Sequence, residues 1–201
     1  MSEQNQHLES IEDIKRLMHK SSRFISLSGL SGVAAGVCAL IASWIAYRKI
    51  QQAGNGGHES LETQLVMIGA VTFIAALVLA FLFTYVRSRQ TGVAIWGYTA
   101  RRVMINVFVP MLAGGLVIWR MIGFGYYNLV APVSLIFYGL ALINASKFTL
   151  NEIRYLGYGQ LLLGLLNLWL EGYGLYFWAM GFGVLHILYG LIMWNKYERN
   201  Y

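Results

Sequence analysis

Six stretches without a charged side chain, each bounded by charged residues, fill most of this sequence after residue 23. They are Phe24–Tyr47, Thr63–Val86, Val103–Trp119, Tyr127–Ser146, Tyr155–Leu170 and Gly172–Asn195. A helix needs about 20 mostly apolar residues to cross the hydrocarbon of a bilayer, and only helices or closed barrels satisfy every backbone hydrogen bond there. Barrel strands would be shorter and would alternate polar and apolar residues. The sequence therefore predicts an all-α membrane protein, with six transmembrane helices in one domain (residues 24–195) and a cytoplasmic tail (196–201).

A short recurring pattern favours an arrangement of these six helices as three helical hairpins. Span four contains Tyr138-Gly139-Leu140 with Asn144 six residues after the tyrosine. Span six repeats this spacing with Tyr189-Gly190-Leu191 and Asn195. Parallel repeats of this kind occur in transporters, and chance similarity between glycine-rich, aromatic helices is the alternative explanation.

The basic residues indicate how the helices are oriented, because Lys and Arg near span ends are held on the cytoplasmic side. Twelve of the fifteen lie before the first span, in alternate connections or after the last span: Lys15, Arg16, Lys20, Arg23, Arg87, Arg89, Arg101, Arg102, Lys147, Arg154, Lys196 and Arg199. The other connections hold Arg48, Lys49 and Arg120. This asymmetry predicts that both chain ends are cytoplasmic. It also explains the basic composition without a nucleic-acid partner.

Residues 1–23 have the pattern of a short cytoplasmic amphipathic helix. Apolar residues recur there at intervals of three and four: Leu8, Ile11, Ile14, Leu17 and Met18. The basic C-terminal half of the segment favours a helix lying on the inner leaflet, with binding to a protein as the alternative. We therefore expect an anionic lipid or a cytoplasmic protein as the partner of the basic face.

Small residues form two adjoining stripes on span one. The first stripe is Ser28, Gly32 and Gly36, and the second is Ser31, Ala35, Ala39 and Ser43. Such stripes let helix backbones approach closely in lipid. The neighbouring helix is expected to come from the same chain or from a second copy in a homo-oligomer.

A polar face on span five is the most site-like pattern in the sequence. Gly157, Gln160, Gly164, Asn167 and Glu171 follow a helical spacing that places them on one face. Gln160 lies twelve residues before Gly172, and His186 lies twelve residues after Gly174. At 1.5 Å per residue, both should lie roughly 18 Å below the outer surface, near the middle of the bilayer.

Tyr138 lies eleven residues below Tyr127 in span four and should reach the same depth. We therefore expect His186, Gln160 and Tyr138 to form a polar cluster, with Asn167 on the same face. Burial disfavours a charged imidazole, so a neutral His186 should both donate and accept a hydrogen bond. The cluster would either bind a ligand, relay a proton, or pair its own side chains, which is common in membrane helices.

Two charged residues at the outer ends of spans are expected to pair with each other. Arg120 follows Trp119 at the end of span three, and Glu171 lies two residues after Trp169. An ion pair would lower the cost of keeping both near lipid.

The motifs of enzymes and cofactor sites are weak or incomplete. His58 and Glu62 are four residues apart but lack the second histidine of a zinc-protease motif. A haem would need a second histidine within the spans to pair with His186. The sequence therefore predicts no metal site, no cofactor and no enzymatic activity.

The segment Ser21–Gly32, with the sequence SSRFISLSGLSG, resembles the start of small bacterial six-span membrane proteins of uncharacterised function. The resemblance covers mainly the first span and implies a multi-pass location in the bacterial inner membrane. It implies no activity, substrate or site.

Two classes of function follow from these observations. The preferred one is a non-catalytic inner-membrane protein that acts as a sensor or as a partner subunit of a regulatory system. The other is a carrier or channel for an ion or small molecule that uses the polar cluster in spans four to six. The second is less favoured, because no span is visibly broken and no acidic residue lies at the centre of one.

Overall fold

The computed structural model describes residues 28–52, 58–91 and 96–199. The amphipathic segment predicted for residues 1–23 lies outside these ranges. Every regular element in them is helical: α2 (Gly29–Gln52), α3 (His58–Thr91), α4 (Tyr98–Gly123), η2 (Tyr127–Leu129), α5 (Val130–Ala145), α6 (Asn151–Trp169), α7 (Gly174–Trp178), η3 (Ala179–Leu185) and α8 (His186–Tyr197). The expectation of an all-helical chain is confirmed.

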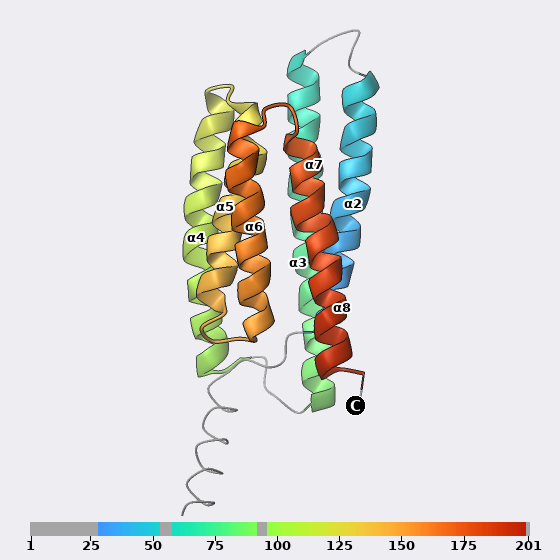
Figure 1. The fold of residues 1–201 in the computed structure, drawn as a ribbon, viewed down its shortest axis with the longest axis vertical. Helices are drawn as coiled ribbons and strands as arrows, with labels where there is room; N and C mark the ends of the chain where they lie inside the picture. Colours follow the sequence, from blue (N-terminus) through green and yellow to red (C-terminus); the bar gives the residue numbers. More distant parts are fainter. Residues whose placement is uncertain (1–27, 53–57, 92–95, 200–201) are drawn as a thin grey trace, which may run out of the picture.

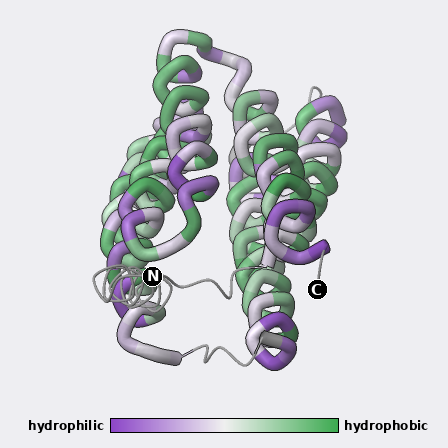
Figure 2. Tube along the Cα trace, turned by 60° about the horizontal axis from the view of Figure 1, so that its bottom comes forward, coloured by the Kyte–Doolittle hydropathy of each residue, from purple (hydrophilic) through white to green (hydrophobic). Residues whose placement is uncertain are grey.

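Within the described residues, five helical segments are long and apolar enough to cross a membrane: Gly29–Gln52, Leu61–Gln90, Tyr98–Gly123, Tyr127–Ala145 and Gly174–Tyr197. The predicted fifth span forms α6 but is not among them, because Glu152, Arg154, Gln160 and Asn167 lower its hydropathy. Figure 2 shows hydrophobic residues along the helices and hydrophilic residues mainly at helix ends, including the end where the C-terminus lies. These features indicate a membrane-associated protein.

The long helices lie side by side along the long axis of the molecule in two groups (Figure 1). In the first group, α5 packs between α4 and α6. In the second, α2 packs against α3 on one side and against η3 and α8 on the other. The last helix therefore makes its most extensive contact with the first, rather than with the helix that precedes it in a hairpin.

Glycines bring α2 into backbone contact with η3 and α8. A Cβ atom added at Gly36 would lie 2.7 Å from the carbonyl oxygen of Gly183, and one added at Gly190 would lie 2.6 Å from that of Gly29. Small residues at such positions allow the dispersion contact that holds helices together in lipid. The glycine stripe of span one thus contacts η3 and α8 of the same chain.

The C-terminal turn ties α2 and α3 together at one end of the bundle. The carboxylate of Glu198 accepts hydrogen bonds from the backbone N–H of Gly29, the first residue of α2, and from Ser28 Oγ at 3.2 Å. An acidic group at this position satisfies a free N–H and the positive end of the helix dipole. Arg87 on α3 lies 3.6 Å from the same carboxylate. The predicted tail at 196–201 is therefore packed against the helices as far as Glu198.

A second set of contacts joins the end of α8 to the start of α6. Glu152 forms an ion pair with Lys196 and accepts a hydrogen bond from the Tyr197 hydroxyl at 3.0 Å. Partial burial raises the pKa of Glu152, but the hydrogen bonds from Lys196 and Tyr197 outweigh it and keep the pKa below its usual value. Together, these contacts fix α6 relative to α8, and so position the polar residues between them.

A candidate polar site between α5, α6 and α8

The polar face of α6 is turned into the bundle. Gly157, Gln160, Gly164 and Asn167 are all buried. Gly157 and Gly139 of α5 face each other so closely that a Cβ on either would lie within 2.9 Å of the other's carbonyl oxygen. This close approach of α5 and α6 places Gln160 beside the interior side of α5 and α8.

The structure brings Tyr138, Gln160 and His186 together. The Tyr138 hydroxyl lies 2.8 Å from Nε2 of His186, and Gln160 Nε2 lies 3.3 Å from Nδ1 of the same ring. The backbone oxygen of Gly181 is 3.0 Å from His186 Nδ1 and 2.8 Å from Gln160 Nε2. Gln160 is 0% exposed and His186 is 6% exposed. The imidazole therefore lies at the centre of a buried hydrogen-bond network.

The distances favour one tautomer of His186. The Gly181 oxygen can only accept, so the nitrogen facing it, Nδ1, must hold the proton. Nε2 then accepts a hydrogen bond from the Tyr138 hydroxyl, and Gln160 donates to the Gly181 oxygen as well. In the other tautomer, the lone pair of Nδ1 would face the Gly181 oxygen at 3.0 Å. A neutral imidazole with the proton on Nδ1 thus satisfies the network, as inferred from its partners.

A π-helical segment, η3, shapes the site. It covers seven residues, Ala179–Leu185, immediately before His186. Segments of π-helix are rare and are frequent at functional sites. A Cβ atom at Gly181 would lie 2.4 Å from Leu135 and 2.5 Å from Gln160 Oε1. A larger residue here would displace the ends of both side chains, and glycine lets the backbone oxygen reach both Gln160 and His186.

Aromatic rings cover the cluster toward the α6–α7 turn. The Phe182 ring lies 5.1 Å from that of Tyr138, 5.1 Å from that of Trp178 and 6.0 Å from that of His186. Gly181, Phe182 and Trp178 were not among the predicted site residues. The sequence signal for them was the pair of glycines, Gly181 and Gly183, on either side of Phe182. This signal was missed because the surrounding stretch has the pattern of an ordinary apolar span.

Asn167 does not join this cluster. It is buried, but its Nδ2 donates to the Leu170 carbonyl at 3.2 Å, near the end of α6. Seven residues separate it from Gln160, which is about 10 Å along a helix. Sharing a helix face therefore did not bring Asn167 to the depth of His186.

The expected ion pair between Arg120 and Glu171 is not formed. The Arg120 guanidinium instead lies 4.0 Å from the centre of the Phe124 ring, one turn away. Among the residues that the structure describes, ion pairs join Arg87 to Glu198 and Lys196 to Glu152. The physical reason is the order of the helices: α5 lies between α4 and α6, and so separates the ends on which Arg120 and Glu171 are placed.

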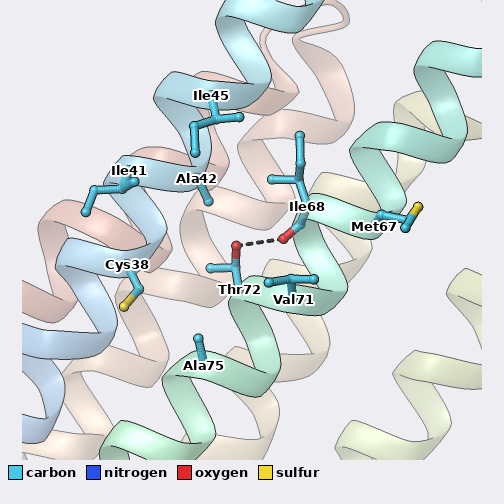
Figure 3. A pocket seen from close by; sticks show the side chains of 9 residues that line it. All are labelled: Cys38, Ile41, Ala42, Ile45, Met67, Ile68, Val71, Thr72 and Ala75. Atoms are coloured by element: carbon cyan, nitrogen blue, oxygen red, sulfur yellow. Dashed lines mark hydrogen bonds between the residues drawn. The ribbon is translucent and has the colours of Figure 1, made fainter.

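A separate groove of about 370 Å³ lies between α2 and α3, away from the cluster (Figure 3). Its lining is apolar apart from Cys38 and Thr72, and the Thr72 hydroxyl already donates to the Ile68 carbonyl at 2.6 Å. Apart from the weakly polar thiol of Cys38, the groove thus offers no free polar group to orient a polar ligand.

No known protein family, curated protein or solved structure matches this chain. The function must therefore be inferred from the geometry itself. Within the described ranges, no group of three or more His, Cys, Asp or Glu side chains is placed to hold a metal ion.

Proposed function

We propose that this protein is a non-catalytic, polytopic protein of the bacterial inner membrane that acts as a sensor or as a partner subunit. In this proposal six segments cross the bilayer as three successive hairpins. The first hairpin is α2 and α3, the second is α4 and α5 (with η2), and the third is α6 and the continuous segment from α7 through η3 to α8. Both chain ends lie on the cytoplasmic side, where twelve of the fifteen basic residues would gather.

The sixth crossing is supported by the way α6 is turned. Its polar residues Gln160 and Asn167 are buried inside the bundle, whereas Tyr158, Leu162 and Leu166 on its outer face are 47–59% exposed. A helix with its polar face inward and its apolar face outward is compatible with lipid, although its overall hydropathy is low.

The observation that most favours the first class of function is the packing of the polar cluster. Gln160 and His186 are almost fully buried, and an added methyl group at Gly181 would overlap both Leu135 and Gln160. The Tyr138 hydroxyl binds His186, and His186 and Gln160 both donate to the Gly181 oxygen. This arrangement supports a structural role for the cluster, because a transport path needs space for its substrate.

The surfaces of α3 and α4 support the role of partner subunit. In their most apolar stretches, 0% of α3 and 6% of α4 is buried within the chain. Large apolar residues such as Met67, Ile74 and Phe81 on α3 are 60–61% exposed. Apart from the faces that pack against α2 and α5, these helices leave their surface for lipid or for the spans of another protein.

A carrier or channel remains the second candidate, because two features of the cluster exceed what packing needs. The π-helical segment interrupts the regular hydrogen bonds of the last span. In addition, Gln160 Oε1 is buried without a hydrogen-bond partner among the described atoms. Both features would suit a site that accepts a polar group in a second conformation.

Site-specific photo-crosslinking along α3 tests the proposal. A photoreactive amino acid would be placed singly at successive positions from Met67 to Leu82 in cells. We expect adducts with one other polypeptide, recurring every three to four residues, because a partner helix contacts one face of α3. A control at Leu162 on α6 should give no such adduct. If every position on α3 reacts only with lipid, the role of partner subunit is refuted.

A further inference from the structure

The basic residues at the C-terminal end of the bundle differ in their partners. Around α2, α3 and α8, two of them lie beside carboxylates: Arg87 beside Glu198, and Lys196 beside Glu152. Arg89 and Arg199 have the neutral partners Tyr85 and Asn195. Around α4, α5 and α6, three basic side chains gather at the α5–α6 turn. They are Arg102, Lys147 and Arg154, and we call them the basic turn.

Each member of the basic turn is held near residues 146–148 by a neutral group. The Arg102 guanidinium lies 5.6 Å from the centre of the Phe148 ring and 4.5 Å from that of Tyr98. Arg154 Nε donates to Ser146 Oγ at 3.3 Å. Lys147 stands between these two contact residues in the chain and reaches Asn144 Oδ1 at 3.4 Å. The ring, hydroxyl and amide contacts position the three cations without reducing their charge.

Carboxylates of the described residues do not form an ion pair with any of the three. The nearest acidic residue in sequence, Glu152, is engaged by Lys196 and Tyr197. Three cations held around one turn repel one another unless an anion lies between them. All three side chains are exposed, so an external anion can reach them.

We propose that the basic turn binds the phosphate headgroup of an anionic phospholipid. The basic turn lies at the ends of helices whose surfaces become apolar farther from the turn. A lipid bound there could therefore place both its headgroup and its acyl chains. Its headgroup would meet the three cations, and its acyl chains would run along exposed apolar residues one to two turns away, such as Ile105 and Phe108 on α4. Exposed aromatic residues beside the turn, Tyr98 and Tyr155, are typical of headgroup depth.

A lipid fits these features better than an acidic protein segment does. Basic clusters between spans at the membrane surface bind anionic headgroups, and arginine is suited to bidentate contact with phosphate. The apolar surface that continues from the turn along α4 offers nothing to a soluble acidic chain. The proposal requires only that this end of the bundle lies at the bilayer surface, and it is independent of the proposed partner subunit.

The test measures lipid binding to the purified full-length protein by native mass spectrometry. Dioleoylphosphatidylglycerol is titrated against dioleoylphosphatidylcholine, first with the unaltered protein and then with the triple variant Arg102→Gln/Lys147→Gln/Arg154→Gln. Each basic residue near a membrane surface contributes about fivefold to the binding of an anionic lipid. We expect the triple variant to lose at least about tenfold of its preference for phosphatidylglycerol.

The matched control removes the three basic residues of the opposite end, Arg48→Gln/Lys49→Gln/Arg120→Gln. It loses the same charge and also loses guanidinium contacts with rings, since Arg48 lies over Trp44 and Arg120 over Phe124. We expect this control to keep the preference. Equal losses in both variants would overturn the proposal, as would binding of polyglutamate, and not of phosphatidylglycerol, at the basic turn.

A single variant keeps the test decisive if the triple variant does not fold. Lys147 is exposed, and its side chain reaches only Asn144 one turn away. Lys147→Gln should therefore leave the unfolding temperature unchanged while lowering phosphatidylglycerol binding by about fivefold. Unchanged lipid binding in this folded variant would contradict the proposal.

Discussion

Replacing Gly190 with alanine is expected to remove most of the stability that holds α8 against α2. The new Cβ atom would lie 2.6 Å from the Gly29 oxygen and 2.7 Å from the Val33 nitrogen, both of which belong to the backbone. Because a backbone cannot rotate away as a side chain can, the two helices must separate. Overpacking in a close interface costs about 1–3 kcal/mol, and we expect a value of about 3 kcal/mol for the free energy of unfolding.

Gly115→Ala is the control for this prediction. Gly115 lies on the exposed surface of α4, and a Cβ atom there would meet nothing within 4 Å. Alanine favours helix over glycine by about 0.5–1 kcal/mol, so this variant should be as stable as the unaltered protein or slightly more so. Both variants would be compared by thermal unfolding in the same detergent. Equal unfolding temperatures would show that α2 and α8 do not pack as described.

Replacing His186 with leucine should lower stability by about 1–3 kcal/mol, because it leaves the buried Tyr138 hydroxyl without its hydrogen-bond partner. Tyr138→Phe alone should lower the stability by less, since it removes the hydroxyl itself and leaves only the Nε2 ring nitrogen of His186 unpaired. The double variant should be no less stable than His186→Leu, as it leaves neither group behind. Thermal unfolding of the two single variants and the double variant measures this coupling.

Additive effects of His186→Leu and Tyr138→Phe would contradict the network, because residues that hydrogen-bond each other show an interaction energy in such a cycle. Ser134→Ala is a suitable control variant. Ser134 lies on α5 like Tyr138, but its hydroxyl donates to the Ala131 carbonyl within the same helix. Its effect should add to that of His186→Leu.

The sequence predicted the helices well because a long stretch without charge is typical of a helix that crosses a membrane. The stretch predicted as Tyr127–Ser146, for example, forms η2 and α5 over residues 127–145. The depth of the polar residues could also be predicted. The rise of a helix per residue is fixed, so equal numbers of residues from one turn placed Gln160 and His186 at a common level. In the structure, Gln160 Nε2 lies 3.3 Å from His186 Nδ1.

The choice of neighbouring helices could not be predicted in the same way. Periodicity shows which face of a helix is polar or small, but it does not name the helix that covers this face. The glycines of span one therefore left a same-chain contact and a second copy as alternatives, and only the structure shows them against α8. The same limit explains the error at Arg120 and Glu171, whose helices are separated by α5.

The π-helical segment was missed because its sequence, AMGFGVL, contains neither proline nor charge. Its cause is tertiary. Gly181 must pass close to Leu135 and Gln160, and the widened turn lets its carbonyl oxygen receive hydrogen bonds from two side chains. A local pattern of apolar residues does not contain this information.

Solid-state NMR of the ¹⁵N-histidine-labelled protein in lipid bilayers tests most directly whether the cluster is closed. His186→Leu would identify the signals of His186 by their loss. The account predicts a neutral imidazole with its proton on Nδ1, no magnetisation transfer from water to this ring, and His186 signals that do not change between pH 5 and pH 8. Strong transfer from water, or a change of protonation within this range, would show that the cluster is open to solvent and would contradict a closed structural core.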